Sequence, residues 1–206
     1  PPWRLAQRRE IQDEAIAHIG FQHPLVGFVD GRDGNHLHVR RHHLDHADAI
    51  ITTGGVSKGA YDIVKAVLTG EGTMEFVEVA MQPGKPQGFG LLGKRRVPVF
   101  TLPGNPVSTL VSFEVFVRPA LEKRAGRLVG DTTTTGLATT SWPSAAHRRT
   151  YTRVRVTRDS TGEYAVEPVG GHGSHMVAGL ALADALAVSS EEAIEVEAGS
   201  RVELML

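Results

Sequence analysis

The sequence predicts an α/β fold, a mostly parallel three-layer sheet domain followed by a small β domain. Apolar strands alternate with amphipathic helices through residues 47–130. Two of these strands end in loops rich in glycine and proline. Beyond a polar stretch, residues 131–206 contain short alternating segments typical of a β unit. Residues 1–46 show no steady periodicity, so we expect an atypical segment there that is disordered or truncated.

Histidines are concentrated in the first segment, which holds seven of the ten in the chain. Two of them, His42 and His46, are four residues apart and would share one face of a helix, as some metal sites require. No accompanying pattern of carboxylates marks a known kind of site, so a solvated, irregular segment is the favoured interpretation. The histidines considered are His36, His38, His42, His43 and His46.

The α/β domain is expected to begin with a short buried strand at residues 49–51. After its loop, apolar residues recur at the i, i+3, i+4, i+7, i+8 spacing of one helix face. Gly70 and Gly72 follow and end this helix. The stripe consists of Ala60, Ile63, Val64, Val67 and Leu68.

Two further strands and a second helix complete the domain. A strand at residues 74–81 ends at the Pro-Gly-Lys-Pro turn of residues 83–86, and another covers residues 97–102. Pro106 suits a first helical turn, and the helix is expected to end near Gly126. Its apolar stripe consists of Leu110, Phe113, Val117 and Leu121.

The threonine-rich residues 131–135 are interpreted as a linker to the second domain. A loop at residues 170–175 is expected to lead into a helix at residues 176–183, and this loop could face the first domain. The expected strands of the β domain are residues 151–156, 164–169 and 201–206.

The two glycine- and proline-rich loops predict anion binding. A strand that ends in glycine lets the backbone turn with its amides outward, and the following helix offers unpaired N–H groups of partial positive charge. One such contact contributes only about 0.3 to 1 kcal/mol at a surface, so two loops on one sheet are better evidence than one. The loops contain Gly54, Gly55, Ser57 and Lys58, and Pro103, Gly104, Asn105, Pro106 and Ser108.

Several side chains near these loops have both a structural and a functional interpretation. Asp62, in a first helical turn, favours the helix dipole or could coordinate Mg²⁺ beside a phosphate. Lys85, between two prolines, is a surface lysine or a fixed cation for an oxyanion. Asn105 is the natural helix cap, and the hydroxyl of Ser108 could cap or bind. Ser174 is a loop serine, and both the structural and the functional interpretation stay open for it.

Residues 55–59 also match the G-x-S-x-G pattern of a nucleophile elbow, with Ser57 as nucleophile. The acid and histidine that a serine hydrolase needs would have to be Asp131 and His147 or His172, which fall in the linker and the second domain, so this alternative is disfavoured. A Walker A loop is excluded because Lys58 precedes the glycine.

The composition of the chain limits the classes of partner that it could bind. The net charge is −1, so nothing favours nucleic acid or a membrane surface, and no apolar run is long enough for a signal peptide or a bilayer span. The chain has no cysteine, which excludes disulfides and thiolate metal sites. We therefore expect a cytoplasmic protein with no nucleic-acid or membrane partner.

Three motifs, in this order, resemble the molybdopterin molybdenumtransferase family, whose eukaryotic counterpart is the E domain of gephyrin. They are Thr-Thr-Gly-Gly-Val-Ser-Lys-Gly-Ala-Tyr-Asp at residues 52–62, Gln-Pro-Gly-Lys-Pro at residues 82–86, and Leu-Pro-Gly-Asn-Pro-Val-Ser at residues 102–108. Residues 149–206 resemble the small C-terminal β domain of that family. The resemblance covers about residues 47–206.

The resemblance implies the last step of molybdenum cofactor synthesis, in which molybdate is inserted into adenylylated molybdopterin and AMP is released with the help of a divalent cation, taken as Mg²⁺. It implies that Asp62 holds the cation, that Lys85 approaches phosphate or molybdate, and that Ser174 closes the site. It also implies a homodimer in the full-length form. Substrate binding would involve Gly54, Gly55, Ser57, Lys58, Pro103, Gly104, Asn105, Pro106 and Ser108.

The chain also departs from the family. Members are longer, with two preceding domains, and residues 1–46 do not match what should stand there. Gln82 stands where many relatives have lysine, so one anion contact is missing. The alternative function is therefore a catalytically inactive pterin-binding or scaffold fragment of the same fold. A nucleotide-transferring branch that adenylylates molybdopterin shares the α/β domain, but the small β domain argues against it.

Overall fold

The structure is a computed structural model that describes residues 26–30, 44, 46–54, 63–69, 72–127, 133–158, 160, 162–170 and 178–205. The chain divides into two compact units. Unit 1 comprises residues 1–77, 86–104 and 112–129, and unit 2 comprises residues 78–85, 105–111 and 130–206. Two short segments that precede residue 130 in the sequence, residues 78–85 and 105–111, therefore belong to the second unit.

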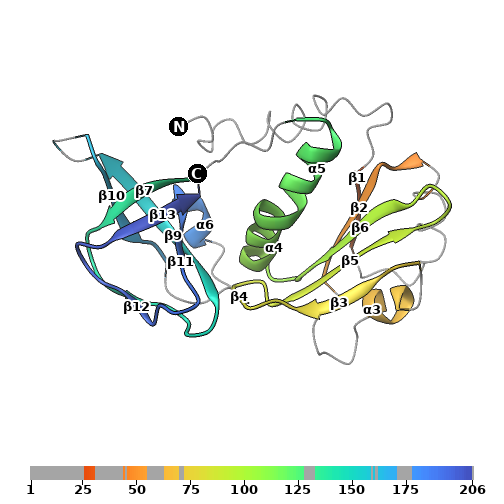
Figure 1. The fold of residues 1–206 in the computed structure, drawn as a ribbon, viewed down its shortest axis with the longest axis horizontal. Coiled ribbons are helices and arrows are strands. Elements are labelled where there is room, and N and C mark those ends of the chain that lie inside the picture. The colour runs from red at the N-terminus through yellow and green to blue at the C-terminus, as the bar shows by residue number, and fades with distance from the viewer. Residues whose placement is uncertain are drawn as a thin grey trace. The chain divides into compact units, whose positions relative to one another are not determined.

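Unit 1 contains a five-stranded sheet, ordered β1-β2-β6-β5-β3 (Figure 1). The strands β1, β2 and β6 are parallel neighbours, and β5 is antiparallel to β6. This arrangement confirms the expected α/β sheet. The bounds are β1 Val26–Asp30, β2 Ala49–Thr53, β3 Glu75–Glu78, β5 Pro86–Leu92 and β6 Val97–Leu102.

Two of these strands were not predicted. The strand β1 lies within residues 1–46, the segment expected to be atypical, and it pairs with β2 along its whole length. The strand β5 lies just after the turn that was expected to end a strand. Both contain glycine, which lowers strand propensity, and their pairing with distant neighbours decides their structure.

Helices cover both faces of the sheet. On one face, Val64 and Leu68 of α3 (Ile63–Leu68) lie in a buried cluster with Ile50 of β2. On the other face, Val117 and Leu121 pack with Ile51. Figure 1 shows α3 and α5 (Arg118–Arg124) on opposite sides of the strands, which confirms the three layers.

The second helix runs without a break through α4 (Pro106–Ser112), a π-helical turn η2 (Phe113–Val117) and α5 (Arg118–Arg124). It ends where expected, because Gly126 has φ +69°, the left-handed conformation that terminates helices. Of the predicted stripe, Val117 and Leu121 are buried, while Leu110 and Phe113 are half-buried.

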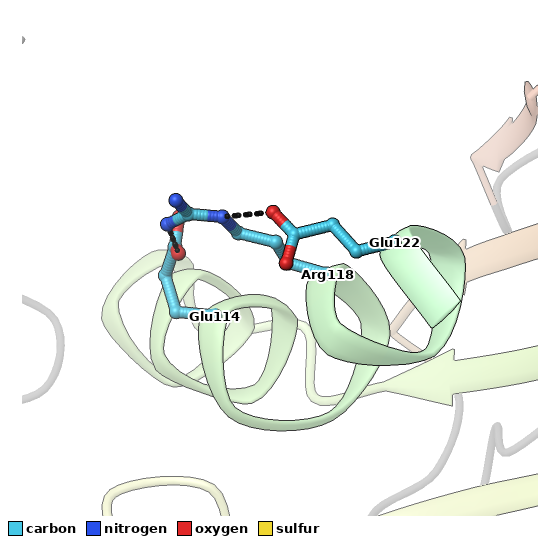
Figure 2. Close-up of polar contacts among 3 residues, drawn as sticks. All are labelled: Glu114, Arg118 and Glu122. Atoms are coloured by element: carbon cyan, nitrogen blue, oxygen red, sulfur yellow. Dashed lines mark hydrogen bonds and ion pairs between the residues drawn. The ribbon is translucent and has the colours of Figure 1, made fainter. Parts of the chain in front are cut away.

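Arg118 links successive turns of this helix (Figure 2). Its Nη1 lies 2.7 Å from Oε2 of Glu114, and its Nε lies 3.3 Å from Oε1 of Glu122. The hydrogen bond with Glu114 is the main cause that raises the pKa of Arg118. Because the side chain is 40% exposed, solvent screening limits the contribution of each pair to less than about 1 kcal/mol.

Unit 2 is built around a closed β arrangement. Its sheet has the order β10-β7-β13-β11-β9-β4, and β10 also pairs with β9, so five strands form a closed ring (Figure 1). Val154, Val166 and Leu204 fill its core. The bounds are β4 Met81–Gln82, β7 Thr133–Ala138, β8 Trp142–Pro143, β9 Arg149–Arg158, β10 Tyr164–Pro168, α6 Ala178–Leu182, β11 Ala185–Ser189, β12 Glu195–Val196 and β13 Arg201–Met205.

The linker prediction is wrong for residues 133–135, which belong to β7 and pair with β13. Threonine is β-branched and suits a strand, so the polar run that indicated a linker is also a strand sequence. The strand β11 was missed because all five of its residues are buried and show no alternation. The predicted strands at residues 151–156, 164–169 and 201–206 correspond to β9, β10 and β13.

Thr52 and Thr101 are register partners on β2 and β6, and both hydroxyls are buried with no hydrogen-bond partner among the residues that the structure describes. An unpaired buried hydroxyl costs about 1 to 3 kcal/mol. We therefore expect Thr101→Val to raise the free energy of unfolding by about 1 kcal/mol. Chemical denaturation measures this change.

The control for this prediction is Thr150→Val. Thr150 is also buried, but its hydroxyl accepts from the amide of Ala145 at 3.3 Å and donates to the carbonyl oxygen of Arg148 at 3.2 Å. Its removal leaves the Ala145 amide without this partner, so Thr150→Val should lower the free energy of unfolding. A Thr101→Val protein less stable than wild type would contradict this account of the hydroxyl.

Among the described residues, no helix combines the length and the apolar character needed to cross a membrane.

Candidate functional site

The two glycine loops meet at one edge of the sheet in unit 1. Because β2 and β6 are parallel neighbours, with Thr53 in register with Leu102, their carboxyl ends lie side by side. The amide of Gly54 donates a hydrogen bond to the carbonyl oxygen of Leu102 at 2.9 Å. A Cβ atom built on Gly104 would lie only 3.0 Å from Cα of Gly54. The loops therefore touch backbone to backbone.

Both positions benefit from the absence of a side chain, for different reasons. Gly54 has φ +85°, a conformation that other residues rarely adopt. Gly104 is required by the close approach itself, since any side chain would press against the backbone of Gly54. This geometry places two exposed or half-exposed backbone turns next to each other, as an anion-binding site requires.

Asn105 caps the helix that follows the second loop, as predicted. Its Oδ1 accepts a hydrogen bond from the amide of Val107 at 3.2 Å, and its carbonyl oxygen accepts from the amide of Thr109 at 2.8 Å. Pro106 is exposed, whereas Ser108 is only 7% exposed. Pro103, in the turn before Gly104, is also buried. The described part of this loop thus exposes mainly backbone rather than hydroxyl groups.

Five of the predicted site residues lie outside the described residues, namely Gly55, Ser57, Lys58, Asp62 and Ser174. Most of the hydrolase residues, Ser57, Asp131 and His172, lie outside them too. The remaining one, His147, is exposed in a turn with φ +63°. Among the described residues, no group of three or more histidine, aspartate or glutamate side chains could hold a metal ion.

Lys85 lies in a turn that belongs to unit 2. The turn follows β4 and contains a cis peptide bond between Gln82 and Pro83. Its base is closed by the amide of Val79, which donates to the carbonyl oxygen of Lys85 at 2.7 Å. The Lys85 Nζ lies 2.8 Å from Oε2 of Glu78, and both side chains are nearly half exposed. The ammonium group is accessible and carries a carboxylate partner that the sequence did not indicate.

A second cation, Arg148, is fixed against the same turn. Its Nη1 donates a hydrogen bond to Oε1 of Gln82 at 3.0 Å. The backbones are also joined, since β4 pairs with β9 and the amide of Arg149 donates to the carbonyl oxygen of Ala80 at 3.0 Å. Sequence reasoning missed Arg148 because this contact spans 66 residues and leaves no local pattern.

A third cation, Arg153, lies inside unit 2 and is only 6% exposed. Its Nη2 donates to the carbonyl oxygen of Gly170 at 3.2 Å, and a Cβ on Gly179 would lie 2.6 Å from its Nη1. Burial lowers the pKa of Arg153 from its usual value. Gly170 is the last described residue before Ser174 in the sequence.

Comparison with protein families gives two matches. Residues 15–123, more than half of the 206 residues, match the family described as "Probable molybdopterin binding domain". Residues 135–206 match the family described as "MoeA C-terminal region (domain IV)". The first match begins at residue 15, inside the segment that was expected to be atypical.

Curated relatives are named molybdopterin molybdenumtransferases. The chain is 40% identical over 171 residues to molybdopterin molybdenumtransferase 1 of Mycobacterium tuberculosis, covering 78% of this chain and 39% of the relative. It is 35% identical over 158 residues to molybdopterin molybdenumtransferase of Haemophilus influenzae, covering 76% of this chain and 39% of the relative. The chain thus spans about two fifths of the length of these relatives.

A solved structure has the same fold. The molybdopterin biosynthesis MoeA protein of Pyrococcus horikosii is 25% identical and aligns with a TM-score of 0.65, over 85% of this chain and 41% of that chain. Together with the family matches, this similarity confirms the family resemblance drawn from the three motifs.

Proposed function

This chain belongs to the molybdopterin binding domain family, and we propose that it is a molybdopterin molybdotransferase, which inserts molybdate into adenylylated molybdopterin and releases AMP. The reaction hydrolyses the phosphoanhydride bond of the adenylylated pterin, so that the oxygen of one water molecule adds to phosphorus. Molybdate exchanges oxygen for the two pterin sulfurs, and the displaced oxygen leaves as water. It is a transferase reaction in molybdenum cofactor biosynthesis.

The contact between Gly54 and Gly104 is the observation that carries the proposal. The substrate has a pyrophosphate and therefore needs a surface lined with amide groups and free of side chains. Two adjoining glycine turns at the carboxyl edge of parallel strands leave such a surface free of side chains, and ligands of open α/β sheets bind at this edge. Because the Gly54 amide donates to the carbonyl oxygen of Leu102, the amides for the phosphates would come from the residues that follow each turn. Gly54, Gly55 and Ser57 would cradle the phosphates, with Lys58 beside them.

The cations of unit 2 suit the second substrate. Molybdate is a doubly charged oxyanion, and Lys85 offers an accessible ammonium group for it. Arg148 adds a guanidinium group, whose donors match the oxygens of a tetrahedral anion. Ser174 belongs to the same assignment through the family resemblance, and the buried Arg153 holds Gly170, which precedes it in the sequence.

Magnesium is part of the proposal through Asp62. A carboxylate oxygen is a ligand that Mg²⁺ prefers, and the cation would neutralise charge on the phosphates when bound. The described residues offer no cluster of ligands for it, so the assignment depends on Asp62 alone. Asp62→Asn should reduce molybdate insertion without changing the fold, and an unchanged cofactor yield would remove Asp62 from the site.

Three further assignments belong to this proposal. The chain would act in the cytoplasm, and its full-length form would be a homodimer, which analytical ultracentrifugation tests. The boundary between the α/β domain and the β domain would lie near residue 130, which limited proteolysis tests.

The experiment that tests the proposed function is a single-turnover assay of AMP release. The purified chain is mixed with adenylylated molybdopterin and Mg²⁺, with and without molybdate, and AMP is separated by chromatography. We expect molybdate-dependent AMP release, together with formation of the molybdenum-loaded pterin. Tight substrate binding without molybdate-dependent AMP release would contradict the transferase function and show a pterin-binding module.

A further inference from the structure

Gln82 connects the two cations that the proposed function assigns to molybdate. It lies three residues before Lys85, at the end of β4, and its side-chain carbonyl oxygen accepts the hydrogen bond from Nη1 of Arg148 at 3.0 Å. Both side chains are half-buried. Pairing of Gln82 with Thr150 across β4 and β9 fixes the backbones on both sides of this contact.

The partners of the neighbouring cations differ from that of Arg148. Lys85 pairs with Glu78 at 2.8 Å, and Arg149 pairs with Glu191 at 3.6 Å. Within the described part of the chain, no carboxylate lies within ion-pair distance of Arg148, and its guanidinium group has the neutral amide of Gln82 as its side-chain partner. Arg148 is therefore held by a neutral acceptor and has no carboxylate beside it in that part of the chain.

The side chain at position 82 determines both whether the charge of Arg148 is neutralised and whether its guanidinium group is restrained. A carboxylate there would hold Arg148 equally well but would neutralise its charge. An apolar side chain of the same length would leave the charge but remove the restraint, so that the flexible arginine would lose rotamer freedom only when the anion binds. A neutral acceptor provides restraint without neutralisation.

We propose that Gln82 is a positioning residue for oxyanion binding: it orients the guanidinium group of Arg148 toward a tetrahedral anion without contacting that anion itself. This inference rests on the proposed function, because molybdate is the anion concerned. It also explains why the chain can tolerate a neutral residue at position 82, since the positive charge there comes from Arg148.

The test is a double-mutant cycle on the full chain. Gln82→Met removes the acceptor, Gln82→Glu adds a charge, and Arg148→Met removes the cation. The measured quantities are the dissociation constant for molybdate, from calorimetry, and the KM and kcat of AMP release. We expect Gln82→Met to raise the dissociation constant and KM by about 5-fold, and Gln82→Glu by about 10-fold or more, with kcat little changed.

The cycle separates positioning from other roles. If Gln82 acts through Arg148, Gln82→Met has no further effect on molybdate binding in the Arg148→Met protein. Equal effects of Gln82→Met in both backgrounds would overturn the inference, as would a Gln82→Glu protein that binds molybdate like wild type. Thermal unfolding of each variant verifies that the fold is intact.

A second readout does not depend on catalysis. In wild type, the Arg148 guanidinium N–H groups should give sharp NMR signals with slow exchange, and Gln82→Met should broaden them. Unchanged Arg148 signals in Gln82→Met would contradict the positioning role. A wild-type chain that binds molybdate but releases no AMP would overturn the proposed function, while the binding cycle would still decide the role of Gln82.

Discussion

Replacement of Lys85 by methionine is expected to lower the rate of molybdate-dependent AMP release by about 100-fold, because an ammonium group that stabilises an oxyanion contributes on the order of 10² to 10³ in rate. Methionine keeps most of the length of the side chain but removes the charge. The Lys85 side chain is nearly half exposed, so its loss should leave the fold intact. Single-turnover kinetics and a thermal unfolding curve measure the two effects.

Two variants sharpen this prediction. Lys94→Met removes a positive charge from an exposed turn in unit 1 and should leave the rate at the wild-type level. Glu78→Gln removes the carboxylate that pairs with Lys85 at 2.8 Å, so it should lower the dissociation constant for molybdate. Equal rates for Lys85→Met and wild type would exclude Lys85 from the site.

Gly104→Val is expected to weaken binding of adenylylated molybdopterin by about 100-fold, because a misplacement of about 1 Å at a site can cost this much. The new Cβ would lie 3.0 Å from Cα of Gly54, and the branched methyl groups would force the two loops apart. Calorimetry measures the dissociation constant. The change should act on binding more than on folding, since Gly104 is exposed.

The control for this variant is Gly126→Val, also in unit 1. Gly126 has φ +69°, so a valine there is strained, but a Cβ would meet no atom within 4 Å. This protein should lose stability and keep the wild-type affinity for the pterin substrate. Comparable losses of affinity in both variants would indicate that Gly104→Val acts through general destabilisation.

The features that the sequence predicted correctly are local. The cap at Asn105 and the buried positions of Val64, Leu68 and Leu121 each follow from a few neighbouring residues. Because helix caps and helix stripes depend on residues within one or two turns, their patterns are visible in the sequence.

The features that were missed depend on contacts between distant segments. Gly88 and Gly90 made β5 look unlike a strand, although Gly88 pairs with Thr101 and leaves the space that the Thr101 hydroxyl occupies. The same limit applies to the site. Lys85 was predicted, but its partner Glu78 and the second cation, Arg148, were not, since nothing in the local sequence marks these contacts.

The central claim is that the turns at Gly54 and Gly104 form one binding site for the phosphates of the substrate. The most direct test is an NMR titration of the ¹⁵N-labelled chain with adenylylated molybdopterin, following the backbone amide signals of these two glycines. We expect both signals to shift along the same binding curve, with one dissociation constant. A response at only one glycine, or two curves with different dissociation constants, would contradict a binding site shared by the two turns.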